Sequence, residues 1–348
     1  MTRRRRQLRL VVPAALLCAA IVSILIANAR STSPADHPHS AGRTRAARAS
    51  GRLAAADPVL RRRRIGMLPA ALQDAAAVSL GGERLVLLGG LDASDTSTAA
   101  LTVIAAGRAE SAGELPAAQH DAQGASLGGQ VYVFGGGQFS SYDHILRYEP
   151  GSGRVSLVGQ LPQPASDVAV TTLGNTAYIV GGYNGEHALD TILAWRPGGA
   201  PMIVGRLPVG LRYAAVAATG SRVIIAGGST EAAGSTEAHA SRVILSFDPS
   251  TGRVTRIGSL PAPLTHASAA SLGGMIYVIG GRGSAPDSQT AAILAIDPAN
   301  GRVRHAGALV RPLSDAAVAI VGGHIVIAGG QSASGTQSSI FELSPETG

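Results

Sequence analysis

The stretch LGGMIYVIGG, residues Leu272 to Gly281, reads as a turn, a strand and a second turn, and close copies of it recur along the chain. A glycine doublet ends an apolar run at 89–90, 135–136, 181–182, 227–228, 280–281 and 329–330. Six units therefore follow one another at spacings of 46, 46, 46, 53 and 49 residues.

Each unit contains four short runs rich in apolar and β-branched residues. In the fifth unit they are HASAASLGG, MIYVIGG, TAAILAIDPANG and RVRHAGALV, from His266 to Val310. Such runs, bounded by Gly, Pro, Asn and Asp, are typical of strands joined by tight turns, and none has the length or period of a helix. Four antiparallel strands in each of six repeats predict an all-β fold, a six-bladed β-propeller.

The repeats resemble the kelch family over residues 61–348. The features shared with that family are the glycine doublets, a tyrosine in the second strand of three units and an Asp-Pro turn in two: Tyr132, Tyr178, Tyr277, Asp248-Pro249 and Asp297-Pro298. The fourth-strand tryptophan typical of kelch units is absent, and valine stands near its place in units two, four and five. The resemblance implies a kelch-like propeller and specifies no ligand.

The two ends of the repeat region complement each other. The last residues, Ile340 to Gly348, match a third strand and its turn and stop before a fourth strand. The segment Arg61 to Pro69 aligns without gaps to the fourth strand Arg253 to Pro261. We therefore expect the N-terminal segment to join the C-terminal blade and close the ring, which leaves no open sheet edges at the junction.

Charge is unevenly distributed along the chain. Residues 1–64 contain fourteen Arg and two acids, or +12, and residues 65–348 contain fifteen Arg and twenty acids, or −5, which together give +7. The basic pI thus belongs to the N-terminal tail, so we expect no nucleic-acid partner. There is no lysine, which excludes Schiff-base chemistry.

The N-terminal part predicts export. Residues 1–9 form a basic cytoplasmic N-terminus, and residues 10–29 are twenty uncharged apolar residues, about 30 Å of helix, enough for a transmembrane helix. Residues 30–60 read as a disordered linker, and 61–348 as the propeller. We expect a single-pass protein of the cytoplasmic membrane with the propeller on the extracytoplasmic side. The alternative is a protein secreted after cleavage near Ala29.

One position recurs at the start of every first strand. It is occupied by Asp74, Asp121, Asp167, Tyr213, His266 and Asp315. The four aspartates have two explanations: a ring of carboxylates that lines the channel, or short side chains that accept backbone N–H bonds at a repeated turn. We prefer the turn explanation.

Three neighbouring loops after the doublets each place an acid close to a histidine. With nearby aromatic and basic residues they supply the ligand-binding candidates Tyr142, Asp143, His144, Tyr183, Glu186, His187, Arg212, Tyr213, Glu237 and His239. Aromatic faces and carboxylates together suit a sugar. The three histidines lie at unequal distances from their doublets, so we predict no metal site and no cofactor.

Two functions remain open. The first is a non-catalytic binding scaffold for a protein or a cell-envelope glycan. The second is a carbohydrate-active enzyme resembling the six-bladed sialic-acid mutarotases, with Glu186, Glu237 and Arg212 as catalytic candidates. Nucleophile-elbow, zinc-protease and phosphate-loop motifs are absent from the sequence. We therefore favour binding over catalysis.

Overall fold

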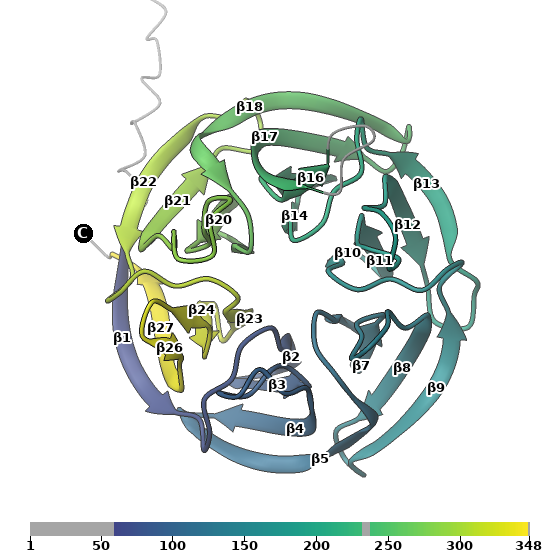
Figure 1. Ribbon diagram of the computed structural model, residues 1–348, viewed down its shortest axis with the longest axis vertical. Coiled ribbons are helices and arrows are strands. Elements are labelled where there is room, and N and C mark those ends of the chain that lie inside the picture. Colours follow the sequence, from purple (N-terminus) through teal and green to yellow (C-terminus); the bar gives the residue numbers. More distant parts are fainter. Residues whose placement is uncertain (1–58, 232–236, 347–348) are drawn as a thin grey trace, which may run out of the picture. The chain divides into compact units, whose positions relative to one another are not determined.

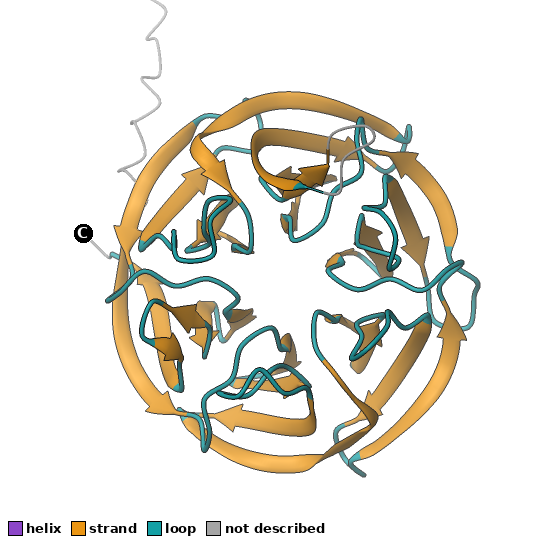
Figure 2. Cartoon of the chain, in the orientation of Figure 1, coloured by secondary structure: helices purple, strands orange, loops and turns teal. Residues whose placement is uncertain are grey.

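The computed structural model describes residues 59–231 and 237–346, and every regular element in them is a β-strand (Figures 1 and 2). The strands form six antiparallel four-stranded blades arranged in a ring (Figure 1). This confirms the predicted all-β, six-bladed propeller with four antiparallel strands per blade.

In the first three blades the strands follow chain order, with the first strand innermost and the fourth on the outer rim (Figure 1). Blade 1 consists of β2 (Ala76–Gly81), β3 (Arg84–Leu88), β4 (Thr98–Ala105) and β5 (Arg108–Gln119). Blade 2 consists of β6 (Gln123–Leu127), β7 (Gln130–Phe134), β8 (His144–Glu149) and β9 (Arg154–Gln160). Blade 3 consists of β10 (Ala169–Leu173), β11 (Thr176–Val180), β12 (Thr191–Trp195) and β13 (Met202–Arg206).

Blades 4 and 6 add short strands to this plan. Blade 4 consists of β14 (Ala215–Thr219), β15 (Arg222–Ala226), β17 (Ala238–Asp248) and β18 (Arg253–Leu264), and β16 (Ser229–Glu231) pairs with β17. Blade 5 consists of β19 (Ser268–Leu272), β20 (Met275–Ile279), β21 (Ala292–Ile296) and β22 (Val303–Ala308). Blade 6 consists of β23 (Ala317–Val321), β24 (His324–Ala328), β27 (Ser339–Pro345) and β1 (Leu60–Met67), beside the small hairpin of β25 (Gln331–Ser332) and β26 (Gly335–Thr336).

The burial of each strand follows from its place in the blade. All five residues of the second strand β11 are buried, because neighbouring blades cover both faces of the sheet. The glycine doublet that follows has a conformational cause: Gly135 has φ +60°, and a Cβ there would overlap the carbonyl oxygen of Ala165. The repeated doublet thus marks the place where the chain of one unit passes close to the connection that follows its fourth strand.

The two ends of the propeller pair with each other. β1 runs antiparallel to β27, with Arg62 opposite Leu343 and Arg64 opposite Phe341, and a bulge separates Arg64 from Gly66. Gly66 is required at the bulge, because a Cβ there would overlap the carbonyl oxygen of Gly107 in the next blade. That this pairing closes the ring and is needed for folding stays a prediction, taken up in the Discussion.

The expected cytoplasmic segment 1–9, transmembrane helix 10–29 and all but the last two residues of the linker 30–60 lie outside the described residues. Within 59–231 and 237–346, no helix is long and apolar enough to cross a membrane.

Apolar clusters fill the interfaces between successive blades, which we call seams. At the seam between blades 2 and 3, Trp195 is 1% exposed and packs edge-on against Tyr132 and Phe134, with ring centroids 4.9 and 5.4 Å away. Its indole N–H donates to the carbonyl oxygen of Gly199 at 2.9 Å. Trp195 is therefore a packing residue, as its place in a third strand suggests.

Candidate functional site

Six residues just before the first strands share an unusual backbone conformation. We call them the ring residues: Asp74, Asp121, Asp167, Tyr213, His266 and Asp315. Their φ angles lie between +52° and +57°, in the left-handed region. Aspartate enters this region more readily than most residues with a side chain, which explains aspartate at four of the six positions. Tyrosine and histidine at the other two positions are departures from the repeat.

The ring residues are joined to one another through their backbones. The amide of each donates to the carbonyl oxygen of the ring residue in the preceding blade, with N···O distances of 3.0 to 3.3 Å. The amide of Asp74 donates to the carbonyl of Asp315 at 3.0 Å, so the circle of six bonds is complete and links every blade. This arrangement fixes where the six side chains begin, since each enters the channel from the same backbone geometry.

The preferred turn explanation for these aspartates does not fit their contacts. Ser314 Oγ donates to Asp315 Oδ2 at 2.5 Å, Tyr213 Oη donates to Asp121 Oδ2 at 2.9 Å, and Arg212 forms an ion pair with Asp167 at 2.6 Å. These partners are side chains rather than backbone N–H groups. The left-handed backbone selects aspartate, and the carboxyl groups then line the channel.

The ring residues line a cavity of about 130 Å³ together with small first-strand residues such as Ala77, Gly124 and Ala169. A cavity of about 150 Å³ is enough for a six-membered ring. The channel cavity is slightly smaller than this, so it can take in part of one small cyclic group, among carboxyl, phenol and imidazole side chains.

Tyr213 and His266, the two departures from aspartate, lie against each other. Their rings are stacked, with centroids 3.7 Å apart and planes 23° apart. Burial and the positive charges of Arg282 and Arg212 lower the pKa of His266 to about 2, so this imidazole is neutral. Arg282 Nη2 lies 3.1 Å from His266 Nε2 and can only donate, so Nδ1 carries the proton and donates to Thr265 Oγ1 at 3.0 Å.

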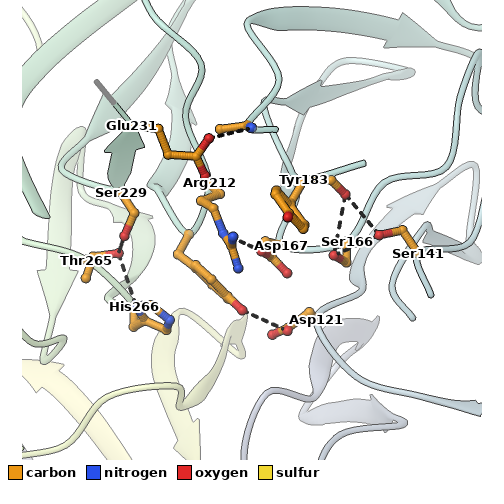
Figure 3. A network of polar contacts seen from close by, with 12 residues as sticks. Asp121, Ser141, Ser166, Asp167, Tyr183, Arg212, Ser229, Glu231, Thr265 and His266 are labelled. Carbon is orange, nitrogen blue, oxygen red and sulfur yellow. Dashed lines mark hydrogen bonds and ion pairs between the residues drawn. The ribbon is translucent and has the colours of Figure 1, made fainter. Parts of the chain in front are cut away.

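Arg212 links the ring to the adjacent loop (Figure 3). Its guanidinium forms the ion pair with Asp167 and lies over the Tyr183 ring, 4.2 Å from the centroid, and 5.0 Å from the Tyr213 centroid. Only 23% of its side chain is exposed. A partly buried cation held between two aromatic faces and one carboxylate is preorganised, with little conformational freedom left to lose on binding a ligand.

The four carboxyl groups form two interacting pairs, Asp74 with Asp315 and Asp121 with Asp167. Burial raises the pKa of Asp74 and that of Asp121 well above the usual value, and the neighbouring carboxylates raise both further. Burial raises the pKa of Asp315 to about 6. For Asp167, burial raises the pKa while the charge of Arg212 opposes the rise. The channel therefore contains protonated carboxyl groups that can donate hydrogen bonds close to carboxylates that can accept them.

Three of the residues proposed from the sequence, Tyr183, Arg212 and Tyr213, are brought together by this geometry. The blade 2 candidates are placed differently. Tyr142 Oη donates to the Ala118 carbonyl at 3.3 Å, Gln160 donates to Asp143 at 3.2 Å, and His144 packs against Tyr142 with centroids 5.0 Å apart. None of Tyr142, Asp143 and His144 lines the channel cavity.

The remaining candidates are exposed. Backbone N–H groups of Glu186 and His187 donate to Asn184 Oδ1 at 3.0 and 2.9 Å, which shapes the loop and leaves both side chains in solvent. Glu237 and His239 lie 3.9 Å apart, with side chains 79% and 55% exposed. Of the three catalytic candidates, only Arg212 contacts a ring residue, Asp167, and none of the three lines the cavity.

Several site residues were not proposed from the sequence. Asp74, Asp121, Asp167, His266 and Asp315 stand in the recognised column, and their role follows once the column is known to face the channel. Two others belong to adjacent columns of the repeat. His120, whose Nε2 lies 3.6 Å from Asp121 Oδ2, directly precedes a ring residue, as Arg212 does. Arg282 directly follows a doublet, as Tyr183 does. Isolated bridges join these two columns in each blade, for example His120 with Gly137 and Arg212 with Ser229. The site can be found in the sequence by comparing three positions across the six repeats: the ring position, the position before it and the position after the doublet.

Among the residues with described placement, no group of three or more His, Cys, Asp or Glu side chains is arranged to hold a metal ion.

Comparisons with known proteins agree with the fold. The kelch motif model matches residues 312–348, and no curated protein matches the sequence. The solved structure of the protein YjhT is 14% identical, with a TM-score of 0.68 over 81% of this chain and 99% of that chain. The motif and the six-bladed arrangement confirm the kelch resemblance, and an identity this low extends to the fold alone.

Proposed function

We propose that this kelch-type propeller is a binding module that holds one sugar residue of a cell-envelope glycan at the channel mouth. The observation that carries the proposal is the preorganised group of Tyr183, Arg212 and Tyr213, which contacts the carboxyl ring through the Arg212–Asp167 ion pair. Carboxyl groups accept hydrogen bonds from the hydroxyl groups of a sugar, and guanidinium and phenol groups donate to them.

Size and polarity favour a glycan over a protein as the partner in the channel. The cavity of about 130 Å³ is slightly smaller than one that binds benzene, so it can take in no more than part of one sugar residue held at the mouth. Protein partners bury on the order of 800 Å² on each side, mostly through apolar centres, and four carboxyl groups within one channel do not offer such a centre.

The cellular location belongs to the same proposal. The apolar run 10–29 would anchor the chain in the cytoplasmic membrane, and the linker would present the propeller to the envelope outside it. A cleaved N-terminus would give a secreted propeller with the same site. Protease protection of the full chain in intact cells and in opened cells distinguishes the sides of the membrane.

A thermal-shift screen of the full-length chain against envelope monosaccharides tests the binding proposal. A sugar at one hundred times its dissociation constant should stabilise the chain by about 2.7 kcal/mol. Arg212→Ala should abolish this shift. The matched control Arg206→Ala removes an exposed arginine, 60% exposed and paired with Asp190, and should retain it. Equal shifts in both variants would refute the site.

A second candidate function, a sugar epimerase or mutarotase, is favoured by one observation. Two buried carboxyl pairs lie in one channel, and the pKa of Asp315 is about 6, close to the pH at which a general acid or base works best. In this function Arg212 would orient the sugar, and the paired carboxyl groups would exchange protons with its ring oxygen and anomeric hydroxyl group.

Anomer exchange measured by NMR separates the two functions. An enzyme would accelerate the exchange of a bound sugar, and Asp315→Asn would slow that exchange without a matching loss of affinity. A binding module would leave the exchange at its rate in buffer.

A further inference from the structure

The six seams are built to one plan, in which equivalent positions of the two blades contribute one buried or partly buried apolar side chain each. One is the residue three before the doublet, from the second strand, and the other comes from the third strand of the next blade. In order around the ring, the pairs are Val86 with Tyr148, Tyr132 with Trp195, Tyr178 with Phe247, Ile224 with Ile296, Tyr277 with Leu343, and Val326 with Ile104.

The seam between blades 6 and 1 has the smallest pair. Four seams contain at least one aromatic ring at these positions, and one contains two isoleucines, whereas this seam has only Val326 and Ile104. Residues that recur in most blades build the blade, whereas a residue that departs from the repeat in one blade can contribute to a binding site.

A cavity of about 300 Å³ lies at this seam. Apolar side chains from both blades line it: Ile65, Leu85, Ile104, Val321 and Val326. The volume is at the lower end of the range for small-molecule sites and exceeds the 150 Å³ that accommodates a benzene ring. The cavity lies away from the ring residues, and none of its lining residues lines the channel.

Three charged side chains, Arg63, Glu83 and Glu342, line the cavity beside these apolar ones. Arg63 Nη2 donates to both carboxylate oxygens of Glu342, at 3.1 and 3.3 Å, so these two charges offset each other. Glu83, from the turn between β2 and β3, is exposed and also lines the cavity. Arg63, Glu83 and Glu342 together carry a net charge of −1, and Glu83 is the one without an opposite charge among them. His324 also lines the cavity, and its Nδ1 lies 3.0 Å from Ser344 Oγ.

We infer that the cavity between blades 6 and 1 is a second binding site, for a small aromatic molecule that carries a protonated amine. The aromatic body occupies the place where four of the other seams have a ring of their own, in contact with Val326 and Ile104. The ammonium group lies towards Glu83, where it meets a carboxylate in partly screened surroundings.

Tryptamine and indole-3-acetate test this inference, because they share one ring system and carry opposite charges. Dissociation constants are measured by saturation-transfer NMR on the full-length chain. Tryptamine should bind more tightly than indole-3-acetate. Glu83→Gln should weaken tryptamine binding by about two- to fivefold, the range for an exposed ion pair, and reduce the preference for the amine.

Val326→Tyr should abolish tryptamine binding, because it places a phenol ring where blades 2, 3 and 5 carry one. Ile104→Phe fills the same space from the other blade and should have the same effect if Val326→Tyr does not fold. Arg212→Ala, at the channel, should leave tryptamine binding unchanged, which separates this site from the proposed sugar site. The inference is overturned if tryptamine does not bind, if indole-3-acetate binds equally well, or if a folded cavity-filling variant binds tryptamine as the natural chain does.

Discussion

Replacing Asp315 with Asn should stabilise the propeller at neutral and alkaline pH. Burial raises the pKa of Asp315 from 3.8 to about 6, so the folded state holds this proton more tightly than the unfolded state. At 1.36 kcal/mol per pH unit, the difference corresponds to ~3 kcal/mol of unfolding free energy that is lost as the pH rises from about 4 to about 6. Asparagine has no proton to lose, tolerates the left-handed backbone and can still accept from Ser314.

The assay is urea unfolding of the full-length chain and of Asp315→Asn at pH values from 4 to 8. The two unfolding free energies should be similar near pH 4 and separate through pH 6, with the variant more stable by up to ~3 kcal/mol at pH 8. Asp248→Asn is the matched control, for which the change in unfolding free energy should have the opposite sign. Hydrogen bonds from Ser250 lower the pKa of Asp248, so this variant should lose stability at neutral pH. Parallel pH profiles for Asp315→Asn and the natural chain would refute the buried carboxyl pair.

Three further substitutions test particular contacts. Trp195→Ala should lower the unfolding free energy by about 3 to 5 kcal/mol in urea titration, because it empties the centre of a seam; a loss below about 1 kcal/mol would contradict that packing role. Gly135→Ala should lower the melting temperature, since the added Cβ overlaps the Ala165 carbonyl oxygen at φ +60°, and an unchanged melting temperature would mean that the doublet is not conformationally required. Tyr213→Phe should cost about 1 kcal/mol in thermal unfolding through loss of the 2.9 Å bond to Asp121, and a stabilised variant would show that this bond contributes nothing.

The fold was accessible from the sequence because it depends on repeated local signals. Every doublet, such as Gly135-Gly136, marks the end of a second strand, so the number of blades follows from counting. The short strands β16, β25 and β26 were not foreseen, because they belong to the loops that vary between blades and carry no repeated pattern.

The site was accessible only in part. A column of aspartates can be read from the repeats, but the sequence does not show that their backbones are left-handed or that the amide of Asp74 donates to Asp315. The positions of the loop side chains could not be predicted from the sequence. Glu186 and Glu237 stand near histidines in the sequence, yet both side chains are exposed to solvent. The direction of a loop side chain depends on turn contacts, such as those of Asn184, rather than on periodicity.

The central prediction is that β1 and β27 pair to close the ring, so that the circle of backbone bonds and the channel site are held in place. Arg61 and Ser344 stand opposite each other in the β1–β27 pair, at a separation that a disulfide can span. In a chain with Cys18, the single cysteine, replaced by Ser, Arg61→Cys with Ser344→Cys should form a disulfide on mild oxidation and raise the melting temperature. The mass of tryptic fragments with and without reductant reports the bond, and Arg61→Cys with Ser250→Cys, in a blade 4 turn, is the control that should remain reduced. A pair at 61 and 344 that stays reduced, or links no more readily than the control, would contradict the closed ring.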